Sequence, residues 1–304
     1  MLRLPEVTLC LIAKNEAQNL HTVLRHGKLF SRILVIDTGS SDNSVELARE
    51  LGADVESFEW CDDFSKARNQ WFESVKEGWI FWLDADDSIT EETALRTVAL
   101  AADAPHDVLG FTYEYEYPNG YICDHIRLFR ADRNIRWRGR IHEHLDFRLS
   151  GTGRLLRADA KILHENFPTY DPVLLERRAE RNNRLLALEH QDDPTNAIVI
   201  QYIAMDHQAH GRHKAAIKWF KKALEHGKPE QDYTWLPEMY VNMARSYARM
   251  GKDYEGRKIL KEGLKVFPRE LPYFMQRHLD MKTPDGRRAE DIGRSRRELL
   301  RALS

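Results

Sequence analysis

Short strand-like runs alternate with helix-like patterns in the N-terminal part of the sequence. The runs are Val7–Ala13, Ile33–Ile36, Val55–Phe58 and Trp79–Leu83. The most apolar of them are typical of strands buried on both faces of a sheet, and the segments between them have the apolar spacing of amphipathic helices. Because strands that alternate with helices form right-handed βαβ units, we expect an α/β fold with a mostly parallel, twisted sheet.

A different pattern follows a helix that is expected near Thr90–Ala101. Val108–Tyr117 and Tyr121–Phe129 alternate between apolar and polar residues, and Pro118-Asn119-Gly120 between them is a strong turn signal. Two alternating segments joined by a tight turn predict a β-hairpin.

The C-terminal part of the sequence carries helical patterns only. An amphipathic helix is expected at Leu174–Leu188, and the residues around Gly211 and Gly251 follow the spacing of two tetratricopeptide helix pairs. The two glycines are 40 residues apart (251 minus 211), whereas this repeat has about 34 residues, so we expect an insertion at Gly227–Leu236. A charged helix at Arg288–Leu303 would cap the array.

Composition is that of a soluble protein with two domains. A chain of 304 residues is long enough for two cores, and its formal net charge of −2 gives no reason to expect nucleic-acid or membrane binding. Three scattered cysteines predict no disulfide framework, residues 1–6 lack a signal peptide's apolar stretch, and no segment could span a membrane. We expect a cytoplasmic protein with an α/β domain at residues 1–170 and a tetratricopeptide-like α-helical domain at residues 171–304.

Polar side chains collect where the expected strands end. They occur in the segments Lys14-Asn15-Glu16, Asp37-Thr38-Gly39, Asp62–Asn69 and Asp84–Asp87. The carboxyl ends of parallel strands share one edge of a sheet, where α/β folds bind ligands. Neither the Gly-x-Gly-x-x-Gly fingerprint nor the Walker A loop occurs in the sequence. A nucleotide at this edge would therefore be held mainly by side chains and a metal ion.

Asp84 and Asp86 follow directly after the apolar run Trp79–Leu83. Two carboxylates one residue apart at a strand end can bind one hard cation, such as Mg²⁺ or Mn²⁺, and leave positions open for phosphates. The alternative is that Asp86 and Asp87 only cap the helix that begins near Thr90. The polar segments at the neighbouring strand ends favour the cation site.

Five motifs occur in an order that resembles glycosyltransferase family 2, the inverting transferases with the GT-A fold. They are Leu11–Glu16, Asp37–Asp42, Asp63–Asn69, Asp84–Asp86 and Trp137–Glu143. The sequence is similar to the branch that carries tetratricopeptide repeats and includes enzymes that glycosylate bacteriocin peptides on cysteine. The resemblance covers roughly residues 5–270, and it implies that residues 1–170 form a GT-A catalytic domain.

The resemblance implies a binding site for a nucleotide sugar. The residues expected to bind it are Glu16, Asp37, Lys66, Arg68, Asn69, Asp84 and Trp137. Glu16 and Asp37 would hold the base and ribose of a uridine nucleotide, and Lys66 and Arg68 would make charge-assisted contacts with its phosphates.

The resemblance also implies a metal site and a catalytic base. The metal ligands would be Asp84, Asp86 and a late histidine, for which His164 matches best and His142 is the rival. Glu143 lies where inverting relatives keep the carboxylate that accepts the proton of the acceptor. If residues 142–144 form a strand, Glu143 points away from both neighbouring histidines. Asp86 and Glu143 are thus the expected catalytic residues, at opposite ends of the sugar.

The expected function is that of an inverting, metal-dependent glycosyltransferase. It would use Mn²⁺ or Mg²⁺ and transfer a sugar from a UDP-sugar to an acceptor, most simply a protein or peptide, because tetratricopeptide pairs form concave surfaces for extended chains. The same helical domain is a candidate surface for assembly into a homo-oligomer.

Two alternatives stay open. One is a transferase acting on a polysaccharide precursor or a modified nucleic-acid base. Its only support is a run of arginines between Arg127 and Arg140, and such runs are usually solvated faces. The other is a non-catalytic adaptor that binds a nucleotide and recruits partners through its repeats. The presence of Asp84, Asp86 and Glu143 favours an enzyme over the adaptor.

Overall fold

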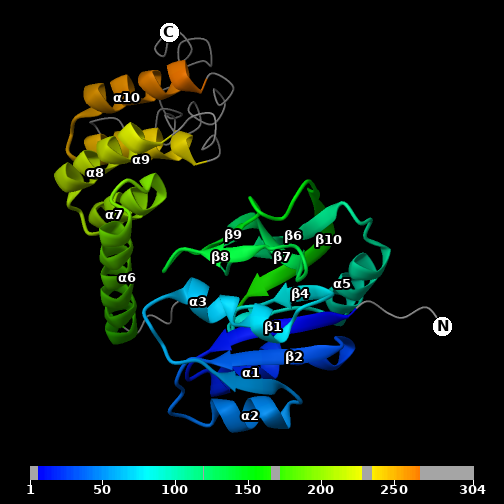
Figure 1. The fold of residues 1–304 in the computed structure, drawn as a ribbon. Coiled ribbons are helices and arrows are strands. Elements are labelled where there is room, and N and C mark those ends of the chain that lie inside the picture. Colours follow the sequence, from blue (N-terminus) through cyan, green and yellow to red (C-terminus); the bar gives the residue numbers. More distant parts are fainter. Residues whose placement is uncertain (1–5, 119, 166–171, 228–234, 268–304) are drawn as a thin grey trace. The chain divides into compact units, whose positions relative to one another are not determined.

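The computed structural model describes two compact units (Figure 1). The described ranges are residues 6–118, 120–165, 172–227 and 235–267, without the side chains of residues 172–175. The units are Met1–Glu180 and Arg181–Ser304, and their division falls inside helix α6 (Pro172–Asp192). The domain boundary at residue 170 stays a prediction. Within the described ranges, no helix is both long and apolar enough to cross a membrane.

An eight-stranded sheet with the strand order β3-β2-β1-β4-β7-β6-β10-β5 forms the centre of the first unit. Its strands are β1 (Val7–Ala13), β2 (Arg32–Asp37), β3 (Asp54–Ser57), β4 (Trp79–Trp82), β5 (Asp87–Ser88), β6 (Val108–Glu116), β7 (Ile122–Arg130) and β10 (Arg154–His164). The four strands β1 to β4 pair in parallel, and the expected hairpin β6–β7 is antiparallel. The expected α/β class is confirmed, with a mixed sheet.

Helices of this unit connect the strands and pack against the sheet. They are α1 (Ala17–Val23), the 3-10 helix η1 (Gly27–Leu29), α2 (Ser44–Glu50), α3 (Phe64–Asn69), α4 (Trp71–Ser74) and α5 (Glu91–Asp103). Strand β4 shows how the core forms on both faces. Trp79 and Phe81 belong to one apolar cluster, whereas Ile80 and Trp82, which point the other way, belong to a second. A strand buried on both faces explains its continuous apolar sequence.

Residues 142–144 do not form the continuous strand that was considered as one alternative for the segment around Glu143. A small separate ribbon pairs β8 (Arg136–Arg138) with β9 (His144–Asp146), so only His144 of residues 142–144 lies in a strand. His142 has a φ of 54°, in the left-handed region, which interrupts any extended run. The alternation of faces expected for a strand therefore does not apply to Glu143.

Paired helices form the second unit. The pairs are α7 (Ala197–Ala209) with α8 (His213–His226) and α9 (Leu236–Arg249) with α10 (Asp253–Val266). Gly211 and Gly251 form the tight turns, with φ values of 70° and 71°. The expected helical pairs are confirmed, and their assignment as tetratricopeptide repeats stays a prediction. The expected helix at Arg288–Leu303 and most of the expected insertion lie outside the described residues.

Candidate functional site

Ends of neighbouring parallel strands bring the polar segments of the first unit to one edge of the sheet. β1 lies between β2 and β4, and Ala13 at the end of β1 pairs with Asp37 at the end of β2. Glu16 follows β1 and Asp84 follows β4. The side chains expected to bind one ligand therefore start from adjacent positions along this edge.

Glu16 and Asp37 are both held by local hydrogen bonds. The carboxylate of Asp37 accepts hydrogen bonds from the backbone N–H groups of Gly39 at 3.1 Å and Ser40 at 3.2 Å. Oε2 of Glu16 accepts one from the side-chain amide of Asn19 at 2.6 Å. Burial raises the pKa of Glu16 above its ordinary value. Both carboxylates are thus fixed at the edge of the sheet.

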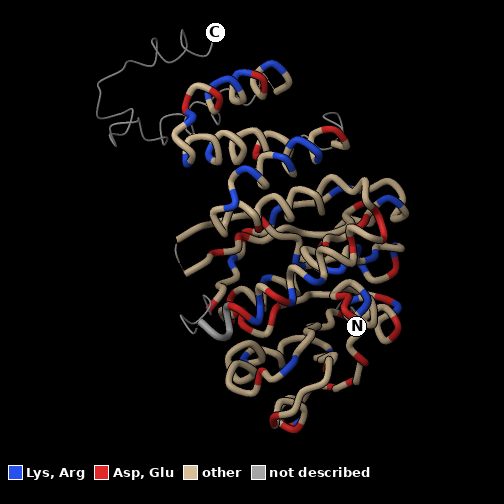
Figure 2. Tube along the Cα trace, turned by 90° about the vertical axis from the view of Figure 1, so that its left-hand side faces the viewer, with Lys and Arg blue, Asp and Glu red and all other residues tan. Residues whose placement is uncertain are grey.

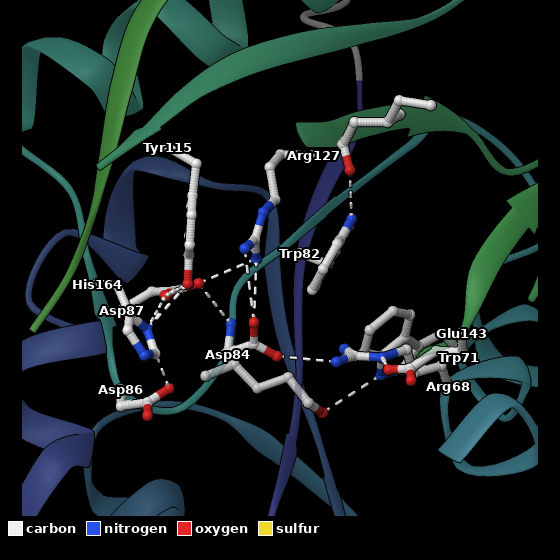
Figure 3. Close-up of polar contacts among 12 residues, drawn as sticks. Arg68, Trp71, Trp82, Asp84, Asp86, Asp87, Tyr115, Arg127, Glu143 and His164 are labelled. Carbon is white, nitrogen blue, oxygen red and sulfur yellow. Dashed lines mark hydrogen bonds and ion pairs between the residues drawn. The ribbon is translucent and has the colours of Figure 1, made fainter. Parts of the chain in front are cut away.

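Arg68 connects two carboxylates that are far apart in the sequence (Figure 3). Its Nε donates to Glu143 at 2.7 Å, and its Nη2 donates to Asp84 at 2.8 Å. The guanidinium carbon lies 4.4 Å from the ring centroid of Trp82 and 5.0 Å from that of Trp137. The Arg68 side chain is only 6% exposed. The structure therefore shows Arg68 as a buried bridge between Asp84 and Glu143, and its predicted contact with phosphate stays a prediction.

Asp84 contacts a second buried arginine. Arg127 lies with Nη1 2.9 Å from Asp87 Oδ2 and with Nη2 3.5 Å from Asp84 Oδ2. Its guanidinium carbon is 3.8 Å from the centroid of the Trp82 ring. Burial raises the pKa of Asp84, but the charges of Arg68 and Arg127 outweigh this effect and hold the pKa well below its ordinary value. Asp84 is therefore an ionised carboxylate between two arginines.

A group of possible metal ligands lies next to these arginines. It consists of Asp86, Asp87 and His164, whose ligand atoms lie within 4.8 Å of one another, and it is the one such group in the described part of the chain. Nδ1 of His164 is 3.2 Å from Asp87 Oδ1 and 3.7 Å from Asp86 Oδ1. The structure thus brings together Asp86 and His164, as expected. His142 lies outside the group, and the metal roles of all these residues stay predictions.

The remaining expected residues have different environments. The side chain of Asn69 exchanges two hydrogen bonds with the backbone of Trp137, at 3.0 Å and 2.9 Å. Trp137 is buried in the second apolar cluster. Lys66 is 61% exposed and lies 3.8 Å from Asp63. Asn69 therefore fixes helix α3 to strand β8, and Lys66 is an exposed cation of helix α3 that lies near Asp63.

Sequence reasoning missed three residues of this site: Asp87, Tyr115 and Arg127. Asp87 was considered only as a helix cap, and Arg127 only as part of a solvated run. A signal was present for Arg127, because it lies two residues before the apolar Phe129, a spacing that puts both on one face of a regular strand, although the pairing of β7 with β6 is irregular at this point. Arg127 is in fact 1% exposed. No comparable signal distinguishes Tyr115 from Tyr113, which faces the same side of β6.

Comparison with known proteins identifies the first unit. The family described as glycosyl transferase family 2 matches residues 8–161. A TPR repeat-containing protein of Synechococcus elongatus is 31% identical over 258 residues, which cover 81% of this chain and 62% of that protein. Glycosyltransferase SunS of Bacillus phage SPbeta is 26% identical over 238 residues, covering 75% of this chain and 55% of SunS. The chain thus spans less than two thirds of the length of these relatives.

Solved structures resemble the chain more distantly. One is glucosyl-3-phosphoglycerate synthase from Mycobacterium tuberculosis in complex with Mn²⁺ and uridine-diphosphate-glucose. It is 14% identical, covers 60% of this chain and 78% of its own, and has a TM-score of 0.44. Mannosyl-3-phosphoglycerate synthase from Rubrobacter xylanophilus has 15% identity, covers 62% of this chain and 75% of its own, and has a TM-score of 0.42.

Proposed function

The chain belongs to glycosyl transferase family 2, and from this premise we propose that it is an inverting, metal-dependent transferase that moves a sugar from a UDP-sugar to a protein or peptide. The observation that carries the proposal is one continuous cluster at the edge of the sheet. Glu143 and Asp84 share Arg68, and Asp84 and Asp87 share Arg127. The expected base and the expected cation site therefore belong to one connected set of charges.

The chemistry of the donor atoms fits a divalent cation. Asp86 supplies carboxylate oxygens and His164 an imidazole nitrogen, a set suited to Mn²⁺ and to other first-row metals. Asp86 and His164 would hold the ion. Asp84, the third ligand that we predicted, lies outside the group of possible ligands and contacts Arg68 and Arg127 instead. A bound cation would stabilise the negative charge of the departing diphosphate as a Lewis acid. Glu16 and Asp37 offer acceptors for the hydroxyl and N–H groups of the nucleoside.

Glu143 is suited to hold a proton on one defined oxygen. Arg68 binds its Oε1, so Oε2 is the atom that can accept the proton of an incoming nucleophile. The Glu143 side chain is 13% exposed, which leaves access for an acceptor while the carboxylate stays fixed. Arg68 keeps the orientation of this carboxylate and so prepares the site before the acceptor arrives.

A peptide acceptor is favoured over nucleic acid by the distribution of charge. In the arginine run, Arg127 is buried, Arg130 donates to the backbone oxygen of Val108 at 2.8 Å, and Arg136 lies over the ring of Phe72. Figure 2 shows Lys and Arg interspersed with Asp and Glu along both units. Nucleic-acid binding needs a continuous cationic surface. Paired helices, in contrast, are typical of proteins that bind extended peptides.

Hydrolysis of UDP-sugars without an acceptor tests the proposal. The full chain is expected to release UDP from one member of a UDP-sugar panel only when Mn²⁺ or Mg²⁺ is present. Asp86→Ala should abolish release while the far-ultraviolet circular dichroism is unchanged. Asp159→Ala is the matched control, because the side chain of Asp159 is 97% exposed and lies outside the site. Equal release by Asp86→Ala and the parent contradicts the metal-dependent mechanism. UDP binding without any release favours the adaptor.

A further inference from the structure

Asp87 belongs to the group of possible metal ligands, but both of its carboxylate oxygens already have partners. Oδ1 accepts a hydrogen bond from the hydroxyl of Tyr115 at 2.6 Å. Oδ2 accepts one from Arg127 at 2.9 Å and one from the backbone N–H of Asp84 at 2.8 Å. Asp87 is 0% exposed. Direct coordination of a cation would require it to break charge-assisted bonds in a buried place, which is costly.

The same carboxylate contacts one nitrogen of His164. Nδ1 of His164 lies 3.2 Å from Oδ1 of Asp87 and 2.9 Å from the hydroxyl oxygen of Tyr115. Tyr115 donates its proton to Asp87, so its oxygen is left as an acceptor. The two nearest neighbours of Nδ1 are therefore acceptors, as is Asp86 Oδ1 farther away at 3.7 Å, and Nδ1 carries the hydrogen. Nε2 then has the free lone pair, and it makes no hydrogen bond to the part of the chain that the structure describes.

Pairing of two strands builds this contact into the sheet. Asp87 in β5 is the direct antiparallel partner of His164 at the end of β10. Tyr115 comes from β6, which pairs with β10 on its other side. Figure 3 shows the Tyr115 hydroxyl and the Asp87 carboxylate meeting the same side of the His164 ring, with Asp86 below it. Three separate strands thus fix one imidazole.

We propose that Asp87 is a positioning residue rather than a metal ligand: with Tyr115 it holds the hydrogen of His164 on Nδ1 and presents Nε2 to a divalent cation shared with Asp86. Arg127 fixes Asp87 in turn by binding its other oxygen. A carboxylate that orients a metal-binding histidine raises its affinity for the ion, and loss of such a partner typically costs about 10-fold to 100-fold in affinity. The inference rests on the proposed function, because it assumes that the site takes up a cation.

Two tyrosines of one strand provide the first test. Tyr115→Phe removes the hydroxyl beside His164 and leaves the Arg127–Asp87 ion pair in place. Tyr113→Phe is the matched control, because Tyr113 is also buried on β6 but its hydroxyl contacts Thr97 at 2.9 Å. We expect Tyr115→Phe to weaken binding of Mn²⁺ by about tenfold, measured by electron paramagnetic resonance on the full chain with UDP present. Tyr113→Phe should bind Mn²⁺ like the parent.

Asp87→Asn gives the second test, with a readout that needs no metal. The amide oxygen of Asn would face the two donors at Arg127 and Asp84, so its NH₂ group would face Nδ1 of His164 and force the hydrogen onto Nε2. We expect ¹⁵N NMR at pH 8 to show an Nδ1–H tautomer in the parent and an Nε2–H tautomer in Asp87→Asn. The His164 signals are assigned by their loss in His164→Gln.

The results separate this inference from the proposed function. An Nε2–H tautomer in the parent, or Mn²⁺ affinity in Tyr115→Phe equal to that of the parent, overturns the inference even if UDP-sugar is hydrolysed. A parent that binds no Mn²⁺ with or without UDP overturns both. An Nδ1–H tautomer with weakened Mn²⁺ binding in Tyr115→Phe supports the inference, even if no UDP-sugar in the panel is hydrolysed. If Asp87→Asn does not fold, the parent tautomer and the tyrosine pair still decide.

Discussion

The buried guanidinium of Arg68 lies between two carboxylates and against indole rings. These groups compensate its positive charge in place of water. Its pKa is raised, because the charges of Glu143 and Asp84 outweigh the opposing effect of burial. A buried ion pair adds little net stability when both partners are present, but removal of one partner leaves an uncompensated charge. The two carboxylates that remain would then repel each other in a partly buried site.

Removal of this arginine is therefore expected to destabilise the first unit strongly. Arg68→Ala should lower the free energy of unfolding by about 3–5 kcal/mol in urea denaturation, since it leaves the largely buried Glu143 without its arginine and Asp84 with Arg127 alone. Lys66→Ala is the control on the same helix, because Lys66 is 61% exposed and should change stability by less than about 0.5 kcal/mol. Similar losses in the two variants would show that the bridge contributes nothing beyond an exposed charge.

Protonation of Asp86 and His164 should control cation binding. Burial raises the pKa of Asp86 to about 6. Burial lowers the pKa of His164, but the hydrogen bond to Asp87 and the charge of Asp86 raise it further, so the net shift is upward. Both groups must lose a proton to bind Mn²⁺. Its affinity should therefore fall by more than about tenfold per pH unit below pH 6, measured by titrations from pH 8 to pH 5. A pH-independent affinity would contradict this.

The raised pKa of Asp86 also makes the stability of the folded state depend on pH. Without a cation, a carboxyl whose pKa is raised on folding favours the folded state below its unfolded pKa of about 3.9. That contribution is lost as the pH rises through 6. The apo protein is thus expected to carry a local instability near neutral pH that Mn²⁺ relieves.

At the scale of elements, helix α3 presents Arg68 and Asn69 to the site. Its first turn is capped by Asp63, whose side chain accepts a hydrogen bond from the backbone N–H of Lys66 at 3.0 Å. Asp63→Ala should cost about 1 kcal/mol of stability and reduce UDP-sugar turnover, because the helix that holds Arg68 would fray.

A capping residue in the second unit serves as the control for Asp63→Ala. Asn196 caps α7 through the backbone N–H groups of Ile198 and Val199 at 3.1 Å and 3.3 Å. Asn196→Ala should cost a similar free energy in thermal or urea unfolding and leave turnover unchanged. If the two variants lose turnover equally, helix α3 has no special role in the site.

Elements with strong local signals could be predicted from the sequence, and others could not. Strand β4 was predictable because it is apolar throughout, and the hairpin β6–β7 because a turn signal separates two alternating runs. Strand β5 has only two residues, Asp87 and Ser88, and forms because β10 is beside it. Residues of such short polar strands carry no periodicity. The pairing of Asp87 with His164 therefore depends on contacts between distant segments, which a pattern along the chain does not contain.

Contacts between distant segments also limited what could be predicted for the site. Glu143, Asp84 and Asp86 could be proposed from the sequence because they occur in recognisable motifs, and the structure connects Glu143 to Asp84 through Arg68. The arrangement of the aspartates and Glu143 at opposite ends of the sugar was argued from chemistry alone and stays a prediction. Tyr115 could not be distinguished in the sequence, because its partners come from other strands.

At the scale of the whole molecule, each unit has its own apolar core. Phe220 lies fully buried in the core of the paired helices. Phe220→Ala should therefore lower the stability of the second unit by about 3–5 kcal/mol while Mn²⁺ binding by the first unit stays at the parental affinity. The measurements are urea unfolding and Mn²⁺ titration of the full chain. Loss of Mn²⁺ affinity in a folded Phe220→Ala variant would show that the two units depend on each other.

The cation pocket forms only if β5 and β10 pair in the register that places Asp87 opposite His164. Side chains of a strand alternate between faces, so a slip of one residue would turn Asp87 away from His164 instead of displacing it slightly. Because β5 is the last strand at its edge of the sheet, the pocket exists only after that edge is complete. Uptake of Mn²⁺ during refolding would accordingly report the moment at which β5 has paired with β10.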